Sequence, residues 1–183
     1  MELSKQLILF RYILRQFGYE EFEVLREEFN NKEQGVSATG YTYFASFLMS
    51  NSDKLIDDRA IQGYDEAIQL YEKRLRENRA EPFFSFKYYQ WFALLFTEYF
   101  FDIYHNNKDL LINALNEYLE ADSNFREVEK FTENDLKKLA YWMATGSGKT
   151  LLMHCNYWQI TRYNKDWENI ILITPNEGLS RQH

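Results

Sequence analysis

The sequence of 183 residues contains a single cysteine, only two prolines and no long apolar run. One cysteine cannot form an intrachain disulfide, which excludes a disulfide-stabilised scaffold and is typical of proteins from a reducing compartment. The longest stretch without a charged residue, 34–52, is rich in Ser, Thr, Gly and Asn, whereas a membrane-spanning helix needs about 20 mainly apolar residues. The first residues also lack the pattern of a secretory signal peptide. We therefore expect a cytoplasmic protein without a membrane segment.

Aromatic residues, by contrast, make up 18% of the sequence, and hydrophobic residues make up 45%. This composition excludes a disordered chain. The densest aromatic segment, 83–104, has its polar residues at helical spacing. A row of rings can stack on nucleic-acid bases. Basic residues do not alternate with these rings, however, so we interpret the segment as a central core helix.

Helical periodicity runs through the rest of the N-terminal part. Further helices are expected over about 3–17, 20–29 and 41–49, from a cap at Ser52–Asp53 to a break at Pro82, and after Asn107. We expect Gly18 to end the first of them. Together these elements predict an all-helical N-terminal domain of residues 1–131.

The charge is unevenly distributed along the chain. The net charge is −7, and residues 139–183, with four basic and three acidic side chains, leave −8 for residues 1–138. Nucleic-acid backbones bind basic surfaces, so we expect any such contact to come from the C-terminal part. The basic run from Lys73 to Arg79 alternates with glutamates, and we interpret it as a solvated helix face with internal ion pairs.

The pattern changes at Thr132, where a short helix is expected. An apolar run of strand length at 139–144 is followed by a glycine-rich turn, a helix from about Lys149 to Tyr163, and a second apolar run at 170–174. Strand, turn, helix and strand in this order predict one βαβ unit. The predicted fold class is therefore a mainly α N-terminal domain, followed at 132–183 by the start of an α/β phosphate-loop (RecA-like) domain.

The turn has the composition of a loop that binds a nucleoside triphosphate. The predicted ATP-binding residues are Thr145, Gly146, Ser147, Gly148, Lys149 and Thr150. The glycines allow backbone N–H groups to point into one concavity, and the following helix adds its positive N-terminal end. We expect the lysine to bind the β- and γ-phosphates and the Thr150 hydroxyl to bind the Mg²⁺ that accompanies ATP.

One position departs from the general loop pattern, because Met143 stands where that pattern has glycine. The resulting sequence Met-Ala-Thr-Gly-Ser-Gly-Lys-Thr resembles motif I of superfamily-two (DEAD/DEAH-type) helicases. Within that superfamily it is most similar to the motor subunits of type I and type III restriction enzymes. The resemblance implies a RecA-like motor that uses ATP and Mg²⁺ and acts on DNA, with RNA as the alternative.

The segment after the second apolar run resembles motif Ia of the same superfamily. It reads Pro-Asn-Glu-Gly-Leu-Ser-Arg-Gln at 175–182. In that family this turn contacts the sugar-phosphate backbone of the nucleic acid. The resemblance therefore implies nucleic-acid contacts by Thr174, Pro175, Asn176, Gly178 and Arg181.

Other parts of the family pattern are missing from the sequence. Family members hydrolyse ATP with an Asp-Glu motif after a third strand, and no such motif follows Thr150. Many members also carry a glutamine upstream of the loop that reads adenine, and here no glutamine lies between Gln90 and Gln159. We therefore expect an N-terminal portion of a helicase or translocase that is inactive alone. Its expected partners are the C-terminal part of the same protein and modification or specificity subunits.

Two alternatives remain open at this stage. The chain could be the product of a truncated gene whose helical domain acts as an interaction module, or a different phosphate-loop nucleotidase such as a small kinase. Neither metal-ligand spacing of histidines nor a paired-carboxylate arrangement points to other chemistry. Cys155 is expected to be a buried apolar residue and not a nucleophile.

Overall fold

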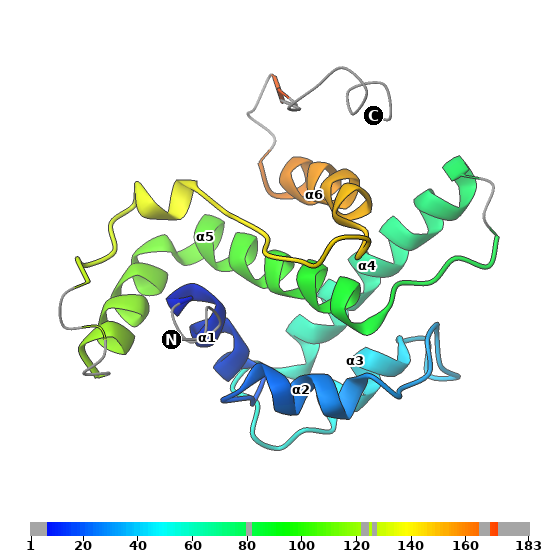
Figure 1. The fold of residues 1–183 in the computed structure, drawn as a ribbon, viewed down its shortest axis with the longest axis horizontal. Coiled ribbons are helices and arrows are strands. Elements are labelled where there is room, and N and C mark those ends of the chain that lie inside the picture. Colours follow the sequence, from blue (N-terminus) through cyan, green and yellow to red (C-terminus); the bar gives the residue numbers. More distant parts are fainter. Residues whose placement is uncertain (1–6, 80–81, 122–124, 126–127, 165–168, 172–183) are drawn as a thin grey trace.

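The computed structural model describes residues 7–79, 82–121, 125, 128–164 and 169–171. Within them the chain forms six α-helices and one 3-10 helix (Figure 1): α1 (Ile8–Gln16), α2 (Phe22–Phe29), α3 (Tyr43–Met49), α4 (Asp58–Arg79), α5 (Tyr88–Ala121), η3 (Asp135–Lys137) and α6 (Lys149–Tyr163). No helix in this part of the chain combines the length and the hydropathy of a membrane span.

The α/β part of the predicted fold is wrong. In the described residues there is no β-strand, and the nearest feature is an isolated bridge between Val36 and Thr42. The run 139–144 is non-helical but has no strand beside it, and Ile170 and Ile171 form exposed, irregular chain. Residues 172–174 lie outside the described part. A strand exists only through hydrogen bonds to a neighbouring strand, and a short apolar run does not reveal whether that neighbour is present.

Helix α5 is the centre of the structure, because α1, α4 and α6 all pack against it (Figure 1). Trp91, Leu94 and Leu95 on α5 are almost fully buried. Aromatic rings meet across helices, with centroids 5.3 Å apart for Phe17 and Phe96. The prediction that the aromatic segment forms a core helix is therefore confirmed, and its rings are used for helix packing.

The helix α5 is interrupted at Asn107, whose dihedral angles (φ −156°, ψ 54°) are not helical. This residue is the one expected to begin a separate helix, and the structure has two helical halves that meet there. The second half buries Leu111, Leu115 and Leu119. The break therefore divides α5 into a half that contacts α6 and a half that carries its own apolar stripe.

Helix ends agree with the sequence at some positions only. Gly18 follows α1 with φ +85°, as a residue that ends a helix does. The expected cap of α4 at Ser52–Asp53 is wrong, because the Asp57 carboxylate accepts the Ala60 N–H at 2.8 Å and α4 begins at Asp58. Asp53 instead donates its N–H to the Asn51 side chain at 2.9 Å, so this segment forms a turn after α3.

Three carboxylates are buried where helices meet. Asp65 accepts the Thr42 N–H at 2.8 Å and the Trp91 indole N–H at 2.9 Å, which joins the start of α3 to α5. Glu72 accepts the Phe86 N–H at 2.9 Å and pairs with Arg76. The ion pair confirms that at least one cation of the basic run is neutralised within α4. The third carboxylate, Glu98, faces α6.

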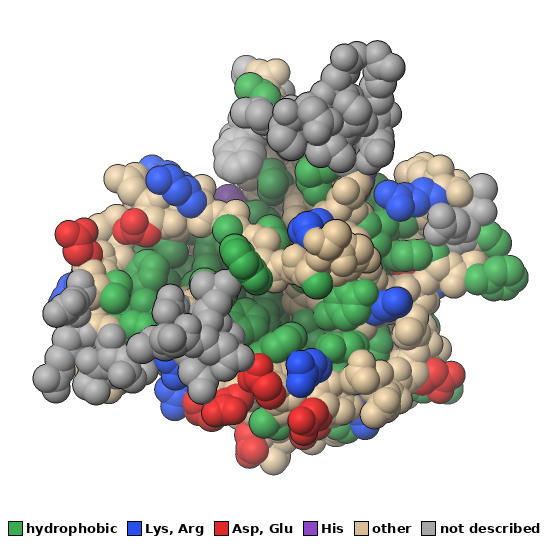
Figure 2. Space-filling model, viewed as in Figure 1, with side chains coloured by type: hydrophobic (Ala, Val, Ile, Leu, Met, Phe, Trp, Pro, Cys, Tyr) green, Lys and Arg blue, Asp and Glu red, His purple; other side chains and the backbone are tan. Residues whose placement is uncertain are grey.

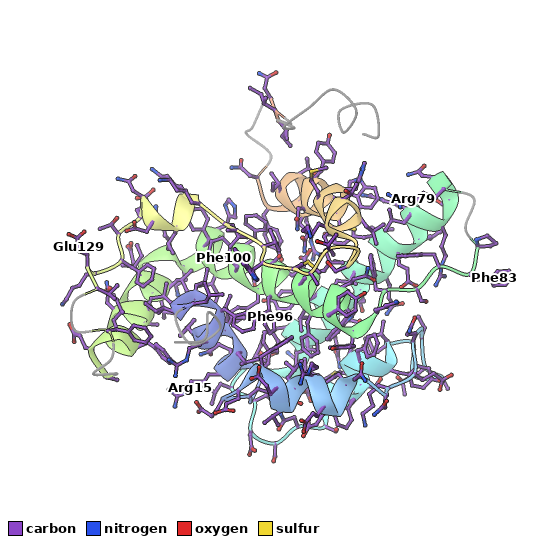
Figure 3. All side chains as sticks on the ribbon, in the orientation of Figure 1. Arg15, Arg79, Phe83, Phe96, Phe100 and Glu129 are labelled. Carbon is purple, nitrogen blue, oxygen red and sulfur yellow. The ribbon has the colours of Figure 1, made fainter. Side chains whose placement is uncertain are left out.

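The surface reflects the uneven charge. Figure 2 shows acidic side chains gathered along the lower edge, over α2, with hydrophobic side chains nearer the centre of this face. Phe83, in the connection between α4 and α5, points into solvent and is 96% exposed (Figure 3). Arg79 ends α4 on the same side of the molecule.

Candidate nucleotide-binding site

The glycine-rich loop at 145–148 leads directly into α6, which begins at Lys149. The run before it lies along α5, because the Tyr141 hydroxyl is 2.7 Å from the Thr97 hydroxyl and accepts the Asn156 side-chain amide at 3.1 Å. The loop is thus held between an extended segment and a helix, as the sequence pattern requires, although no sheet supports it in the described residues.

Both glycines of the loop adopt left-handed backbone conformations, with φ +79° at Gly146 and φ +92° at Gly148. Side chains disfavour this region, which explains the glycines. The two positions differ in their surroundings. A Cβ atom at Gly146 would meet nothing within 4 Å, whereas one at Gly148 would lie 2.6 Å from the Gln90 side-chain nitrogen. Gly148 is therefore favoured by its conformation, and a side chain there would also displace the end of the Gln90 side chain.

The Lys149 amine folds back across the loop. Its Nζ donates to the carbonyls of Met143 at 3.1 Å and Ala144 at 2.9 Å. The Ser147 hydroxyl donates to the same Ala144 carbonyl at 2.7 Å. These bonds draw the ends of the loop together and place a positive charge over its backbone.

The start of α6 has the properties of an anion site. The first hydrogen bond of the helix runs from the Leu152 N–H to the Gly148 carbonyl at 3.0 Å. The N–H groups of Lys149 and Thr150 come before it, and such groups at a helix start lack an intrahelical partner. Thr150 is exposed beside them. Backbone N–H groups at a helix start, a lysine amine and a threonine hydroxyl are the groups that could hold a nucleotide phosphate and its Mg²⁺.

Gln90 is the residue of this site that the sequence did not reveal. Its side-chain amide donates to the Ser147 carbonyl at 2.9 Å, and its side-chain oxygen accepts the Lys87 N–H at 3.0 Å. The side chain is buried, at the start of α5. The one available signal was an amide within a helix of mainly apolar character. Gln90 and the loop are more than fifty positions apart in the sequence, so no local pattern indicates that they are in contact.

The predicted nucleic-acid contacts cannot be placed in the same way. Thr174, Pro175, Asn176, Gly178 and Arg181 all lie outside the described residues.

The described part of the chain gives little support for a metal site or for a nucleophilic cysteine. No group of three or more His, Cys, Asp or Glu side chains there is arranged to hold a metal ion. Cys155 is fully buried on α6, as expected, and burial raises the pKa of its thiol to about 12. A buried thiol with a raised pKa is a poor nucleophile.

Comparison with known proteins gives one informative match. No curated protein matches the sequence, and no solved structure matches the fold. A family model described as "Type III restriction enzyme, res subunit" matches residues 84–183, which is more than half of the 183-residue chain. The matched region includes α5 as well as the glycine-rich loop and α6. The chain therefore belongs to the family of the type III restriction enzyme res subunit, within the helicases.

Proposed function

We propose that this chain supplies the ATP-binding part of a nucleic-acid-dependent ATPase of the restriction-enzyme type. The observation that carries this proposal is the geometry of residues 145–150, in which two left-handed glycines lead into a helix start and the lysine amine folds back over the loop. Membership of the res subunit family supports the same function.

In this proposal, ATP binding replaces hydrogen bonds that the Lys149 amine now makes with backbone carbonyls before the loop. Phosphate oxygens would take the place of the Met143 and Ala144 carbonyls as acceptors of the Lys149 amine. The N–H groups at the start of α6 would bind the same phosphates, and the Thr150 hydroxyl would bind Mg²⁺. Bound Mg²⁺ would neutralise phosphate charge. The type of loop supports ATP as the ligand, and the family supports DNA as the polymer that stimulates turnover.

We also propose a division of labour along the chain. Residues 132–183 would open the motor, with the turn after Thr174 contacting DNA or RNA, while residues 1–131 form the helical unit on which it rests. Hydrolysis would need the Asp-Glu motif that this sequence lacks. The 183-residue chain is therefore expected to bind Mg–ATP without turning it over at a measurable rate.

A titration of the chain with a fluorescent ATP analogue and Mg²⁺ tests the nucleotide site. Lys149→Ala should raise the Kd at least about tenfold, because it removes a charge-assisted contact to phosphate. Lys130→Ala is the matched control, since Lys130 pairs with Glu120 on the surface and its loss should leave the Kd unchanged. Equal affinity of the wild-type chain and Lys149→Ala would contradict the proposal.

The motor function needs a second experiment, on a protein that joins this chain to an Asp-Glu motif. Its ATPase rate should rise on addition of DNA or RNA, and Lys149→Ala should abolish the stimulated rate. A rate that ignores nucleic acid would refute the motor function. Transfer of phosphate to a small acceptor would instead favour a kinase-type nucleotidase.

A further inference from the structure

Helix α6 is held by α5 at both of its ends. Near its start, Gln90 on α5 binds the Ser147 carbonyl. Near its end, Glu98 on α5 receives hydrogen bonds from the last two turns of α6. The two residues of α5 are eight positions apart, which places them on one side of the helix about two turns from each other.

The Glu98 carboxylate is fully buried and accepts four hydrogen bonds. Three of the donors belong to α6 and one to α4: Gln159 Nε2 at 3.0 Å, Arg162 Nη1 at 3.2 Å, Tyr163 Oη at 2.9 Å and Tyr71 Oη at 2.7 Å. Burial and the charge of Glu98 raise the pKa of both tyrosines, so their hydroxyls stay protonated and donate at neutral pH. The carboxylate is thus fully surrounded by donors.

A helix that is fixed at one end only can tilt about that end. α6 has 15 residues and is therefore about 22 Å long, so a tilt of roughly 3° about one end moves the other by about 1 Å. Displacements of this size matter in sites that bind and orient a reacting group. Attachments at the far end restrict this freedom: three α6 side chains bond to Glu98, and the Gln159 amide also donates to the Leu94 carbonyl of α5 at 2.9 Å.

We propose that Glu98 is a positioning residue for the nucleotide site, and that it acts by fixing the end of α6 opposite to Lys149 and Thr150. This inference rests on the proposed function. Asp65 and Glu72 are also buried carboxylates, but their recorded hydrogen bonds go to Thr42, Trp91, Gln69, Arg76, Ser85 and Phe86, none of which belongs to α6. Among the buried carboxylates of the described residues, the attachment of α6 is therefore particular to Glu98.

The test compares Glu98→Gln with Glu72→Gln in the 183-residue chain. Each variant replaces one buried carboxylate by an amide of the same size, and thermal unfolding measures how much stability each loses. The Kd for a fluorescent ATP analogue with Mg²⁺ is then measured well below both melting temperatures. Glu98→Gln should raise this Kd roughly fivefold, and Glu72→Gln should leave it within about twofold of the wild type.

Hydrogen exchange supplies a readout of the geometry itself. In Glu98→Gln, the amides of the first turn of α6 should exchange faster than in the wild type, since the helix start is freed although the substitution is at its other end. Glu72→Gln should not change exchange there. Equal effects of the two variants on the Kd and on exchange would overturn the proposal, because they would reflect a general loss of stability.

A second pair of variants decides the question if Glu98→Gln does not fold. Tyr163→Phe and Tyr71→Phe each remove one hydroxyl donor from Glu98, but only Tyr163 lies on α6. Tyr163→Phe should weaken binding of the analogue more than Tyr71→Phe does, and the reverse order or equal effects would overturn the proposal. A wild-type chain that does not bind the analogue would refute the proposed function and this inference together. Wild-type binding that Glu98→Gln leaves intact would refute the inference alone.

Discussion

The side-chain amide of Gln90 lies 2.9 Å from the carbonyl of Ser147, and the same amide nitrogen would lie 2.6 Å from any Cβ atom placed on Gly148. The Gln90 side chain therefore binds the glycine-rich loop and also occupies the position next to Gly148 where a larger side chain would lie. A residue far upstream of the loop thus contributes to its shape. Two predictions about the loop depend on this contact.

Gly148→Ala should weaken nucleotide binding more than Gly146→Ala, because the Gln90 amide must move and lose its hydrogen bond to the loop. Both substitutions place a side chain at positive φ, which costs about 1–2 kcal/mol, but only the alanine at position 148 also meets Gln90. Thermal unfolding and the Kd for the ATP analogue measure the two effects. The double variant Gly148→Ala with Gln90→Ala should recover part of the loss, and an equal loss in both single variants would contradict the assigned contact.

Gln90→Ala should weaken nucleotide binding, because the loop loses its hydrogen bond to α5. The substitution also removes the acceptor of the Lys87 N–H, so a loss of about 1–2 kcal/mol in the free energy of unfolding is expected. Gln69→Ala is the matched control. Gln69 lies on α4, and its side-chain amide donates to the Gly40 carbonyl at 3.1 Å. Its removal should lower the free energy of unfolding without changing the Kd for the nucleotide.

Cys155 should resist thiol reagents in the folded chain. Burial raises the pKa of its thiol to about 12 from the usual 9.0, although the Arg79 guanidinium opposes the shift. Because the folded state has the higher pKa, the stability associated with the protonated thiol is complete below pH 9 and is lost as the pH rises from 9 towards 12.

At pH 8, labelling with an aromatic disulfide reagent should therefore be at least about a hundredfold slower in the native chain than in guanidinium chloride. The unfolded chain at the same pH is the control, because its rapid labelling shows that the reagent is active. Rapid labelling of the native chain would show that α6 opens readily.

A fragment of residues 1–131 should be much less stable than the whole chain. Leu136, Leu151, Leu152 and Cys155 belong to the same buried cluster as the earlier helices, and Glu98 would lose three of its donors. Each buried leucine contributes about 1.5–3 kcal/mol, so the melting temperature should fall by more than about 10 °C. A fragment of residues 1–164 retains α6 and should melt well above the 1–131 fragment. Equal melting of both fragments would instead support an independent helical module.

The helices of this fold follow from local patterns in the sequence. Apolar spacing indicated α1 to α4, and the loop followed by an apolar-rich segment indicated α6 with its observed ends. Such patterns depend only on the residues of the helix itself. The strands were expected incorrectly at 139–144 and at 170–171, the described part of the second run, because strand formation depends on a partner. The cap of α4 was misplaced because Asp53 and Asp57 are both residues that commonly cap a helix, and the structure has Asp57 at the helix start and Asp53 in a turn with Asn51.

The candidate site was predictable in its local part only. Residues 145–150 could be assigned from the sequence, since each has a chemical reason to be there. Gln90 and Glu98 could not, because their contacts join segments more than fifty positions apart. A lone amide or carboxylate in an apolar helix signals that a polar partner is needed, but it does not identify that partner.

The break in α5 at Asn107 has a mechanical consequence. Gln90 and Glu98 lie in the half before the break, whereas Leu111, Leu115 and Leu119 lie in the half after it. A continuous helix transmits bending along its whole length, but one with a non-helical residue can bend there without moving both arms. The two arms can therefore differ in direction while the end of α1 contacts both of them, since Phe17 stacks on Phe96 in the earlier arm and the Arg15 guanidinium lies over the Tyr118 ring in the later arm.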